Sequence, residues 1–265
     1  MIYLVGGNGF VGSAYARLFE KMGLHHRVIT RENYDDYRGT TCDVLINANG
    51  NSKKFLAARE PLNEFDQSVR SVAESLEAFK CNTYVMLSTG DVYPEQHAPE
   101  VTVEDQPIDP ARQSRYGLHK RLAEMLVQGT QARWLVIRMG GFVGPGLRKN
   151  AIHDMLTGAP VWLSPASELQ FISTDRAAGL VWRLVEKGVS GEVVNLGSSG
   201  LVNLGALHAR LGSSSEFKPD APTVRYELSL ARLAALTGEA LPDSMAEVEA
   251  FVAAEGPRIA AATGN

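Results

Sequence analysis

The order of apolar and polar positions along the chain predicts alternating strands and helices. Six short, mostly apolar segments have the length and composition of strands buried in a sheet. Longer segments in which apolar residues recur every three or four positions indicate amphipathic helices. The expected strands are 2–5, 26–30, 43–47, 84–87, 134–138 and 193–196, and the expected helices begin at Phe10 and cover 61–80, 116–128 and 175–186. This alternation is typical of an α/β fold with a parallel sheet.

The chain begins with the arrangement that a phosphate-binding turn requires. Gly6, Gly9 and Gly12 follow the first expected strand at the spacing G-x-x-G-x-x-G, and a helix follows them. Gly6 allows a sharp turn, Gly9 leaves room for a pyrophosphate, and Gly12 lets the helix approach the strand closely. The helix N-terminus adds free N–H groups and a positive dipole end. Together these features predict a dinucleotide site in a Rossmann-type, doubly wound parallel sheet.

One connection is too short for the full form of this fold. About a dozen residues separate the strands at 26–30 and 43–47, which is fewer than a crossover with a helix needs. Either the crossover is reduced to a turn or a strand is missing. In both cases the adenine side of the expected cofactor pocket would be unusually open.

After Gly200 the pattern changes to short helices, expected at 203–211, 229–237 and 244–254, with Ser, Gly and Pro breaks between them. We therefore expect a division of the chain into two parts. Residues 1–145 and 171–198 would form the NAD(P)-binding Rossmann domain. Residues 146–170 and 199–255 would form a small C-terminal substrate-binding lobe, followed by a frayed tail at 256–265.

Composition limits the possible functions. Hydrophobic residues make up 45% and charged residues 21% of the 265 residues, as in ordinary globular proteins. The net charge of −4 offers no basic surface for nucleic acid or an anionic membrane, and no apolar run reaches the roughly 20 residues of a membrane span. Two cysteines without C-x-x-C spacing and six histidines without ligand spacing predict neither a disulfide framework nor a metal site. The expected compartment is the cytoplasm.

The residues after the second expected strand bear on the choice between NAD and NADP. NAD-binding chains usually place an acidic residue there to bond the ribose 2′-hydroxyl. Here Thr30 and Arg31 occupy that region, and Glu32 comes slightly late. A guanidinium can pair with a 2′-phosphate, so we expect NADP in preference to NAD. The alternative is that Arg31 is a solvated loop residue.

Tyr116 and Lys120 lie four positions apart, on one face of the helix expected at 116–128. A free tyrosine has a pKa of about 10, and a nearby ammonium together with an oxidised nicotinamide would lower that pKa. Tyr116 could then exchange a proton with a carbonyl or an alcohol at neutral pH, and Lys120 could also hold the cofactor ribose. The spacing alone is weak evidence, since such pairs are common on solvated helix faces.

A series of motifs, taken in order, makes the chain resemble the extended short-chain dehydrogenase/reductases, the NAD-dependent epimerase/dehydratase family. The motifs are GGNGFVG, LSTGDVYP, YGLHK, IRMGGFVGPG and QFISTDRAAG, and the resemblance covers about residues 1–255. It implies that Thr89, Tyr116 and Lys120 form a catalytic triad in which Thr89 bonds to the reacting oxygen.

The same motifs and the glycine turn predict the residues around the ligands. The expected cofactor contacts are Gly6, Gly9, Phe10, Val11, Gly12, Thr30, Arg31, Asn47, Ala48, Asn49, Lys120 and Met139. Asp91 and Arg148 would contact the substrate, with Lys149 as a second cation for a diphosphate. Surface charge without a ligand is the alternative for Arg148 and Lys149, and capping of a turn is the alternative for Asp91.

Departures from the family pattern narrow the expected function. Dehydratases that resemble this chain carry an Asp directly after the Thr, where this chain has Gly90. Epimerases usually carry an Asn at the position of Gly141, and the family's Asn on the long helix is Ser68 here. These differences disfavour dehydration and a standard UDP-hexose epimerase.

What remains is an NAD(P)H-dependent reductase of a keto group on a nucleotide-linked (deoxy)sugar, with Tyr116 as general acid and base. A sugar-nucleotide epimerase of the same family is the alternative. A non-catalytic NAD(P)-sensing protein is the second alternative, but it would not need Thr89, Tyr116 and Lys120 together. The expected partners are a small-molecule substrate and a second copy of the chain, because 62–79 and 114–128 resemble helices of a four-helix dimer interface.

Three further side chains have two interpretations each. Arg138 could reach the substrate or form a structural ion pair. Trp162 and Phe171 could line a sugar pocket, although the apolar core of the lobe is the preferred interpretation.

Overall fold

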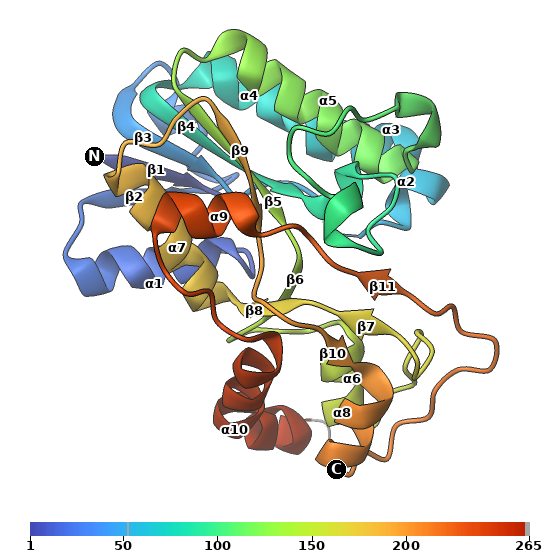
Figure 1. The fold of residues 1–265 in the computed structure, drawn as a ribbon. Coiled ribbons are helices and arrows are strands. Elements are labelled where there is room, and N and C mark those ends of the chain that lie inside the picture. The colour runs from blue at the N-terminus through green and yellow to red at the C-terminus, as the bar shows by residue number, and fades with distance from the viewer. Residues whose placement is uncertain (52, 263–265) are drawn as a thin grey trace.

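The computed structural model describes residues 1–51 and 53–262, and its centre is a six-stranded sheet (Figure 1). The strands are β1 (Ile2–Val5), β2 (His26–Ile29), β3 (Thr41–Asn47), β4 (Lys80–Thr89), β5 (Trp134–Met139) and β9 (Glu192–Leu196). They lie in the order β2-β1-β3-β4-β5-β9, and neighbours are parallel throughout. Every expected strand is present, and the predicted Rossmann-type α/β fold is confirmed.

Helices cover both faces of this sheet. The bounds are α1 (Gly12–Met22), α4 (Ser71–Ala78), α5 (Arg115–Thr130), α7 (Thr174–Glu186) and α9 (Ala231–Thr237). One face packs against α1, α7 and α9 through a core in which Phe19 meets Trp182 edge-on. The other face packs against α4 and α5 through a second core that includes Val72 and Val127. The two layers leave the carboxyl ends of all the strands at one common edge, where ligands of such folds bind.

The short connection between β2 and β3 keeps its strand but has no α-helix. Residues 30–40 contain one 3₁₀ turn, Asp35–Tyr37, and β3 still pairs with β1. Tyr34 and Tyr37 cover the sheet here, because their rings pack edge-on against Phe79 and Tyr3. Of the two alternatives, the crossover reduced to a turn is therefore correct.

The helix expected over 61–80 is interrupted in its middle. It consists of α3 (Pro61–Phe65), a π-helical turn (Asp66–Arg70) and α4, and β4 begins at Lys80. The short α2 (Leu56–Arg59) precedes α3. A π-helical turn holds an extra residue, so it rotates the apolar stripe about the helix axis. Leu62 and Phe65 are exposed, whereas Val69 and Val72 are buried.

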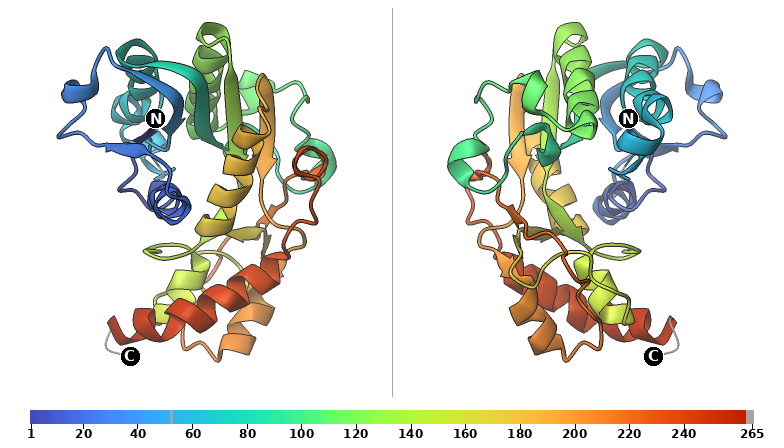
Figure 2. Two further views of the ribbon diagram at one scale, coloured as in Figure 1. Left: turned by 90° about the vertical axis from the view of Figure 1, so that its left-hand side faces the viewer. Right: turned by 90° about the vertical axis from the view of Figure 1, so that its right-hand side faces the viewer.

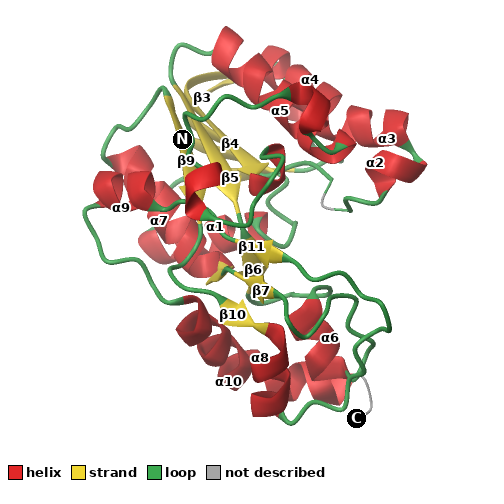
Figure 3. Ribbon diagram, turned by 45° about the vertical axis from the view of Figure 1, so that its right-hand side comes forward, coloured by secondary structure: helices red, strands yellow, loops and turns green. Residues whose placement is uncertain are grey.

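Short strands and helices form a second group beyond the carboxyl edge of the sheet (Figures 1 and 3). Strand β6 (Gly141–Val143) pairs with β8 (Phe171–Ser173), and β7 (Glu168–Leu169) lies between β10 (Val202–Asn203) and β11 (Arg225–Tyr226). Figure 3 shows β6, β7, β10 and β11 between the large sheet and the helices α6 (Ala151–Thr157), α8 (Leu204–Leu211) and α10 (Ser244–Ala262). These helices share a core with Val143 and Phe171.

Two segments differ from the expected division of the chain. Helix α10 continues to Ala262, so 256–262 are helical and not frayed, while 263–265 lie outside the described residues. In Figure 2 this helix runs along the base of the molecule. Helix α9 comes from the range expected in the lobe, but it packs against α7 and β9 of the sheet. A buried apolar stripe shows that a helix is covered, but not by which element.

Within residues 1–51 and 53–262, no helix combines the length and the apolar character that crossing a bilayer requires.

Candidate functional site

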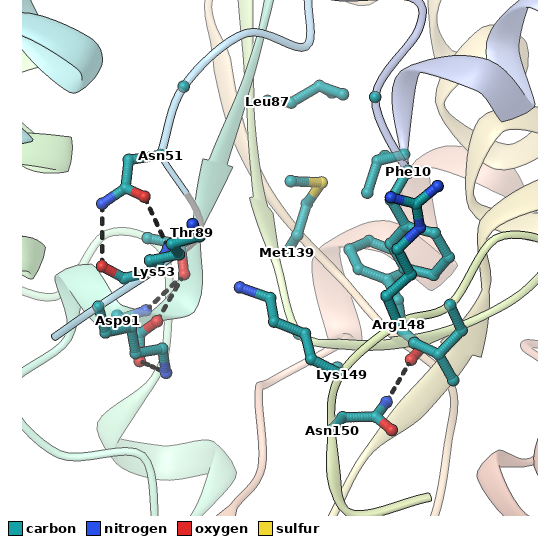
Figure 4. Close-up of a pocket in the computed structure, with 18 of the residues that line it drawn as sticks. Phe10, Asn51, Lys53, Leu87, Thr89, Asp91, Met139, Arg148, Lys149 and Asn150 are labelled. Carbon is teal, nitrogen blue, oxygen red and sulfur yellow. Dashed lines mark hydrogen bonds and ion pairs between the residues drawn. The ribbon is translucent and has the colours of Figure 1, made fainter. Parts of the chain in front are cut away.

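A cavity of about 1040 Å³ lies between the carboxyl edge of the sheet and the second group of elements. This is the size of cavities that hold cofactors and small ligands. In Figure 4, Thr89 and Asp91 face Phe10 and Arg148 across the cavity, and Met139 and Lys149 lie between them. Residues far apart in sequence therefore meet at the place where open α/β sheets bind ligands.

The glycine turn has the close approaches that the sequence predicts. Gly6 has a φ of 78°, and a Cβ on it would lie 2.9 Å from the Asn49 nitrogen. A Cβ on Gly12, the first residue of α1, would overlap the Gly6 carbonyl oxygen. Gly6 and Gly12 thus allow the close backbone contacts that form the turn, while Gly9, Phe10 and Val11 line the cavity. Because Gly6, Gly9 and Gly12 have no side chains, the turn leaves room for a dinucleotide pyrophosphate at the N-terminus of the helix.

At the end of β3, some residues line the cavity and others support it from outside the lining. Ala48 and Asn49 line the cavity, but Asn47 does not. The Asn47 amide is buried: it donates to Tyr84 Oη at 2.7 Å, and its oxygen accepts the Asn49 N–H at 3.0 Å. Asn47 therefore holds the loop that borders the cavity, and its expected contact with the cofactor stays a prediction.

Thr30 and Arg31 also lie outside the cavity lining. The Thr30 N–H donates to Asn33 Oδ1 at 2.7 Å, and Asn33 in turn donates to Val28 O at 3.0 Å. The neighbouring Thr30 hydroxyl, a backbone N–H and the charge of Arg31 lower the pKa of Glu32. Glu32, which comes slightly late in the sequence for a ribose contact, thus stands beside Arg31 as an acidic group.

Thr89, Tyr116 and Lys120 all line the cavity. Thr89 ends β4, and its hydroxyl donates to Asp91 Oδ2 at 2.9 Å while accepting the Asp91 N–H at 3.2 Å. The second Asp91 oxygen accepts from Lys54 Nζ at 2.6 Å. Thr89 therefore caps the turn, and the Asp91 carboxylate borders the cavity while it accepts from Thr89 and Lys54.

Helix α5 carries the other two candidates. Ser114 caps its first turn by accepting the Gly117 N–H at 3.0 Å. A Cβ on Gly117 would overlap the Asp91 carbonyl oxygen, so only glycine lets the helix approach the Thr89–Asp91 turn this closely. The Tyr116 hydroxyl donates to Asn51 O at 2.9 Å. Lys120 Nζ is buried and donates to Leu87 O at 3.5 Å.

The protonation of these groups differs from the expectation. Burial, then the charges of Asp91 and Glu64, raise the pKa of Tyr116, and Lys120 is not among the causes. Burial lowers the pKa of Lys120, while the carboxylates of Glu124 and Glu64 act in the opposite direction. The prediction that Lys120 makes the phenol acidic is therefore wrong for the protein alone. Tyr116 is instead held as a phenol, which is the form that donates a proton.

The substrate candidates face the same cavity. Arg148 and Lys149 line it, and burial together with the charges of Lys53 and Lys54 lowers the pKa of Lys149. Phe171 is buried in the core of the second group and also lines the cavity. Trp162 also lines the cavity but is 68% exposed, so the preferred interpretation as a core residue is wrong for it. Its ring lies 5.3 Å from Lys218 Nζ.

Arg138 has a structural role. Its guanidinium is buried and donates to Glu124 Oε2 at 2.8 Å and to Tyr93 Oη at 2.9 Å. Although burial acts to lower it, the Glu124 carboxylate raises the pKa of Arg138 above the usual range. Of the two interpretations, the structural ion pair is correct.

Several residues of the site are absent from the sequence interpretation. Tyr226, Lys53, Lys54 and Asn51 line the cavity, and the carboxylate of Glu64 is buried against His119 of helix α5. Tyr226 belongs to a strand of two residues, too short to leave a periodic pattern. No three His, Cys, Asp or Glu side chains of the described residues gather as a metal site would require.

The comparisons with known proteins agree with this geometry. The model of the NAD dependent epimerase/dehydratase family matches residues 2–197. No curated protein matches the chain significantly. A UDP-glucuronic acid 4-epimerase variant from Bacillus cereus superposes with a TM-score of 0.80 at 16% identity, covering 97% of this chain and 98% of that one. RMD from Pseudomonas aeruginosa, complexed with NADPH, gives 0.74 at 21% identity over 96% and 99%. A UDP-galactose 4-epimerase gives 0.73 at 21% identity over 93% and 95%. These likenesses show the fold.

Proposed function

The chain belongs to the NAD-dependent epimerase/dehydratase family, whose members are enzymes of the short-chain dehydrogenase/reductase type, and we propose that it is an NAD(P)H-dependent reductase of a keto group on a nucleotide-linked (deoxy)sugar. One observation carries the proposal. Thr89 and Tyr116 bring two hydroxyl groups, and Lys120 an ammonium, to one cavity at the carboxyl edge of the sheet. The residue after Thr89 is Gly90, so the chain lacks the acid that dehydration needs there.

The chemistry follows from these groups. Gly6, Gly9 and Gly12 would hold a reduced nicotinamide cofactor, which would supply the hydride for the carbonyl carbon. Tyr116 donates its proton to the carbonyl oxygen, which becomes the alcohol oxygen, and Thr89 holds that oxygen by a hydrogen bond as negative charge develops on it. Lys120, buried beneath the cavity, supplies positive charge for the phenolate that remains. Tyr116 must first release Asn51 O, its present acceptor.

The epimerase alternative has support from the comparisons, because two of the solved structures with this fold are UDP-sugar 4-epimerases. Epimerisation uses the same three residues in both directions and consumes no cofactor. The absence of Asn at the positions of Gly141 and Ser68 counts against it. A protein that only senses NAD(P) would not need the three groups together.

We propose NADPH as the preferred cofactor, with NADH accepted. Arg31 supplies the positive charge that a 2′-phosphate requires. The Glu32 carboxylate beside it would repel that phosphate and suits a 2′-hydroxyl, so the preference depends on which of the two side chains turns towards the ribose. RMD was solved with NADPH and the Bacillus cereus epimerase variant with NAD.

For the substrate, we propose that the small lobe binds the nucleotide sugar. This lobe consists of 146–170 and of 199–255 without helix α9, which packs on the sheet. Arg148 and Lys149 reach the cavity from this side and would bind a diphosphate. We also propose a cytoplasmic homodimer. Leu62 on α3 is 80% exposed and Met125 on α5 is 54% exposed, which leaves apolar side chains on two neighbouring helices open to a second copy.

The test is an assay with NADPH and NADH in parallel against dTDP-4-keto-6-deoxyglucose and related keto sugar nucleotides. Stoichiometric oxidation of the cofactor with formation of the alcohol is the expected result. UDP-glucose and UDP-galactose are assayed alongside. Their interconversion without net cofactor oxidation would replace the reductase by the epimerase. Tight cofactor binding without either reaction would support the sensor.

A further inference from the structure

Lys54 and Asp91 form an ion pair on the cavity wall next to Thr89. Lys54 Nζ lies 2.6 Å from Asp91 Oδ1, and the other carboxylate oxygen, Oδ2, accepts the Thr89 hydroxyl at 2.9 Å. All three side chains line the cavity, and Figure 4 shows Thr89 and Asp91 side by side. The Asp91 side chain is only 14% exposed. A carboxylate buried to this degree requires donors on its oxygens, and here Lys54 and Thr89 supply them.

Two further contacts hold the ends of this chain of bonds. The Asp91 N–H donates to the Thr89 oxygen at 3.2 Å, which keeps that oxygen beside the carboxylate whichever way its O–H points. Lys54 Nζ also lies 5.7 Å from the centre of the Tyr226 ring, within the range of a cation–π contact. Tyr226 is fixed in turn, because its carbonyl oxygen accepts the Gln170 N–H at 3.2 Å. The ammonium and the carboxylate therefore have defined positions, as binding groups require.

The Thr89 hydroxyl cannot serve Asp91 and a substrate at the same time. It has one O–H, and Asp91 Oδ2 accepts it in this structure. In the proposed reaction that O–H turns to the reacting oxygen of the substrate, so Asp91 Oδ2 loses its donor. A buried acceptor left without a donor costs free energy. A substrate avoids this cost if it supplies an O–H of its own beside the reacting oxygen.

The spacing of the two protein oxygens indicates where that O–H lies on the substrate. Thr89 Oγ1 and Asp91 Oδ2 are 2.9 Å apart. Oxygens on neighbouring ring carbons of a sugar are separated by about one hydrogen-bond length, roughly 2.8 Å. The two protein oxygens can therefore face two neighbouring oxygens of the ring. Lys54 has three N–H donors, of which one serves Asp91, so the same hydroxyl can also accept a bond from Lys54.

The charges of the pair favour a hydroxyl over other groups of a sugar. A hydroxyl can donate to Asp91 and accept from Lys54, whereas a carbonyl oxygen has no proton to donate. A carboxylate would meet the negative charge of Asp91 within hydrogen-bond distance and would be repelled. Because Asp91 balances the charge of Lys54, the pair suits a neutral polar group and not an anion.

We propose that Lys54 and Asp91 bind the hydroxyl on the ring carbon next to the reacting carbonyl, and that Lys54 determines specificity for α-hydroxy keto sugars. The inference rests on the proposed reduction, in which Thr89 holds the reacting oxygen. In a 4-keto-6-deoxy sugar this hydroxyl is the one on C3, since C5 carries none. The substrate O–H replaces that of Thr89 on Asp91, so the hydroxyl binds as Thr89 turns to the carbonyl.

The test compares dTDP-4-keto-6-deoxyglucose with its 3-deoxy analogue, dTDP-4-keto-3,6-dideoxyglucose, which lacks only this hydroxyl. We expect the wild type to prefer the first about 10- to 100-fold in kcat/KM with NADPH, because the second loses one hydrogen bond to a charged group. Lys54→Met removes the ammonium and keeps a side chain of similar length. It should lower kcat/KM for the 3-hydroxy substrate about tenfold and leave that for the analogue nearly unchanged.

Two variants serve as controls. Lys54→Arg keeps a positive charge and N–H donors, so it should retain most of the preference for the 3-hydroxy substrate. Arg70→Met also breaks an ion pair, with Glu74 at 3.2 Å, but on an exposed helix face outside the cavity lining. It should change kcat/KM for neither substrate. Equal losses on both substrates in Lys54→Met would show that the ion pair is only structural and would overturn the inference.

The outcomes separate this inference from the proposed function. If the wild type reduces both keto sugars with the same kcat/KM, the reductase stands and the role of Lys54 is wrong. If it oxidises no NADPH but interconverts UDP-glucose and UDP-galactose, the reductase is wrong, and the same comparison with UDP-3-deoxyglucose in epimerisation decides the role of Lys54. If the wild type catalyses neither reaction, Thr89 holds no reacting oxygen and the inference fails as well.

Discussion

Arg138 and Glu124 form a buried ion pair, 2.8 Å from Nη2 to Oε2, between strand β5 and helix α5. Ser88 adds a hydrogen bond to Glu124 Oε1 at 2.6 Å from β4. Tyr116 and Lys120 lie on the same helix, one to two turns towards its N-terminus. The pair therefore fixes helix α5 against the two strands that end at the cavity.

Removing one member of this pair should destabilise the protein strongly. Glu124→Gln leaves the Arg138 charge buried without its counter-charge, and we expect a loss of about 3–5 kcal/mol in the free energy of unfolding. Denaturant unfolding measures it. The control is Glu74→Gln, whose partner Arg70 lies at 3.2 Å on an exposed helix face and where a loss of about 0.5 kcal/mol or less is expected. Equal losses in the two variants would contradict the structural role of Arg138.

Tyr116→Phe should separate binding from turnover. The hydroxyl is the proposed proton donor, so its removal should lower kcat by about 10²–10⁴-fold. The Kd of NADPH, followed by fluorescence titration, should stay within the range of the wild type because the glycine turn is untouched. Tyr15→Phe is a suitable control, since its buried hydroxyl has no hydrogen-bond partner among the described residues and does not line the cavity. Full activity in Tyr116→Phe would remove the residue from the mechanism.

The cofactor preference should respond to Arg31 and Glu32 in opposite directions. Arg31→Ala removes the cation proposed to pair with a 2′-phosphate, so it should weaken NADPH binding by about tenfold and leave NADH nearly unaffected. Glu32→Gln removes the neighbouring negative charge and should strengthen NADPH binding. Titration calorimetry with both cofactors measures the ratio of the Kd of NADPH to that of NADH in each variant. Equal effects of Arg31→Ala on NADH and NADPH would show that Arg31 is only a solvated loop residue.

The sequence allowed the sheet and the core of the site to be predicted because both depend on local signals. Continuous apolar runs mark buried strands, and Gly6 to Gly12 lie within one turn. Thr89 and Tyr116 were identifiable only because the motifs around them resemble a family. Tyr226 leaves no such signal, since it reaches the cavity through the pairing of β11 with β7.

The electrostatics of the site also depend on long-range contacts. The charge of Lys120 suggested an acidic phenol at Tyr116, but burial and then the carboxylates of Asp91 and Glu64 raise the pKa of Tyr116. Glu64 belongs to α3, far from Tyr116 in sequence. The spacing of two residues on one helix says nothing about what the fold buries around them.

Alkaline pH should destabilise the protein through its buried thiols. Burial, then the neighbouring Cys81, raises the pKa of Cys42 to about 12, and burial raises that of Cys81 to about 11. Because thiols in the unfolded chain titrate near their ordinary pKa of 9.0, the unfolded state loses protons first as the pH rises. Stability is therefore fully present below that pH and declines as the pH approaches 11. Denaturant unfolding across this range measures the slope, and Cys42→Ala should flatten it; an unchanged slope would assign the effect to other groups.

Assembly can be tested at the exposed apolar residues of α3 and α5. A glutamate introduced at Leu62 or Met125 would place a charge in the proposed interface between two copies, where desolvation without a partner is costly. We expect the wild type to sediment as a dimer and Leu62→Glu and Met125→Glu to sediment as monomers. Met22→Glu on α1, at a methionine with 44% exposure, is the control and should leave the dimer intact. A monomeric wild type, or a dimer that survives both substitutions, would exclude this surface as the interface.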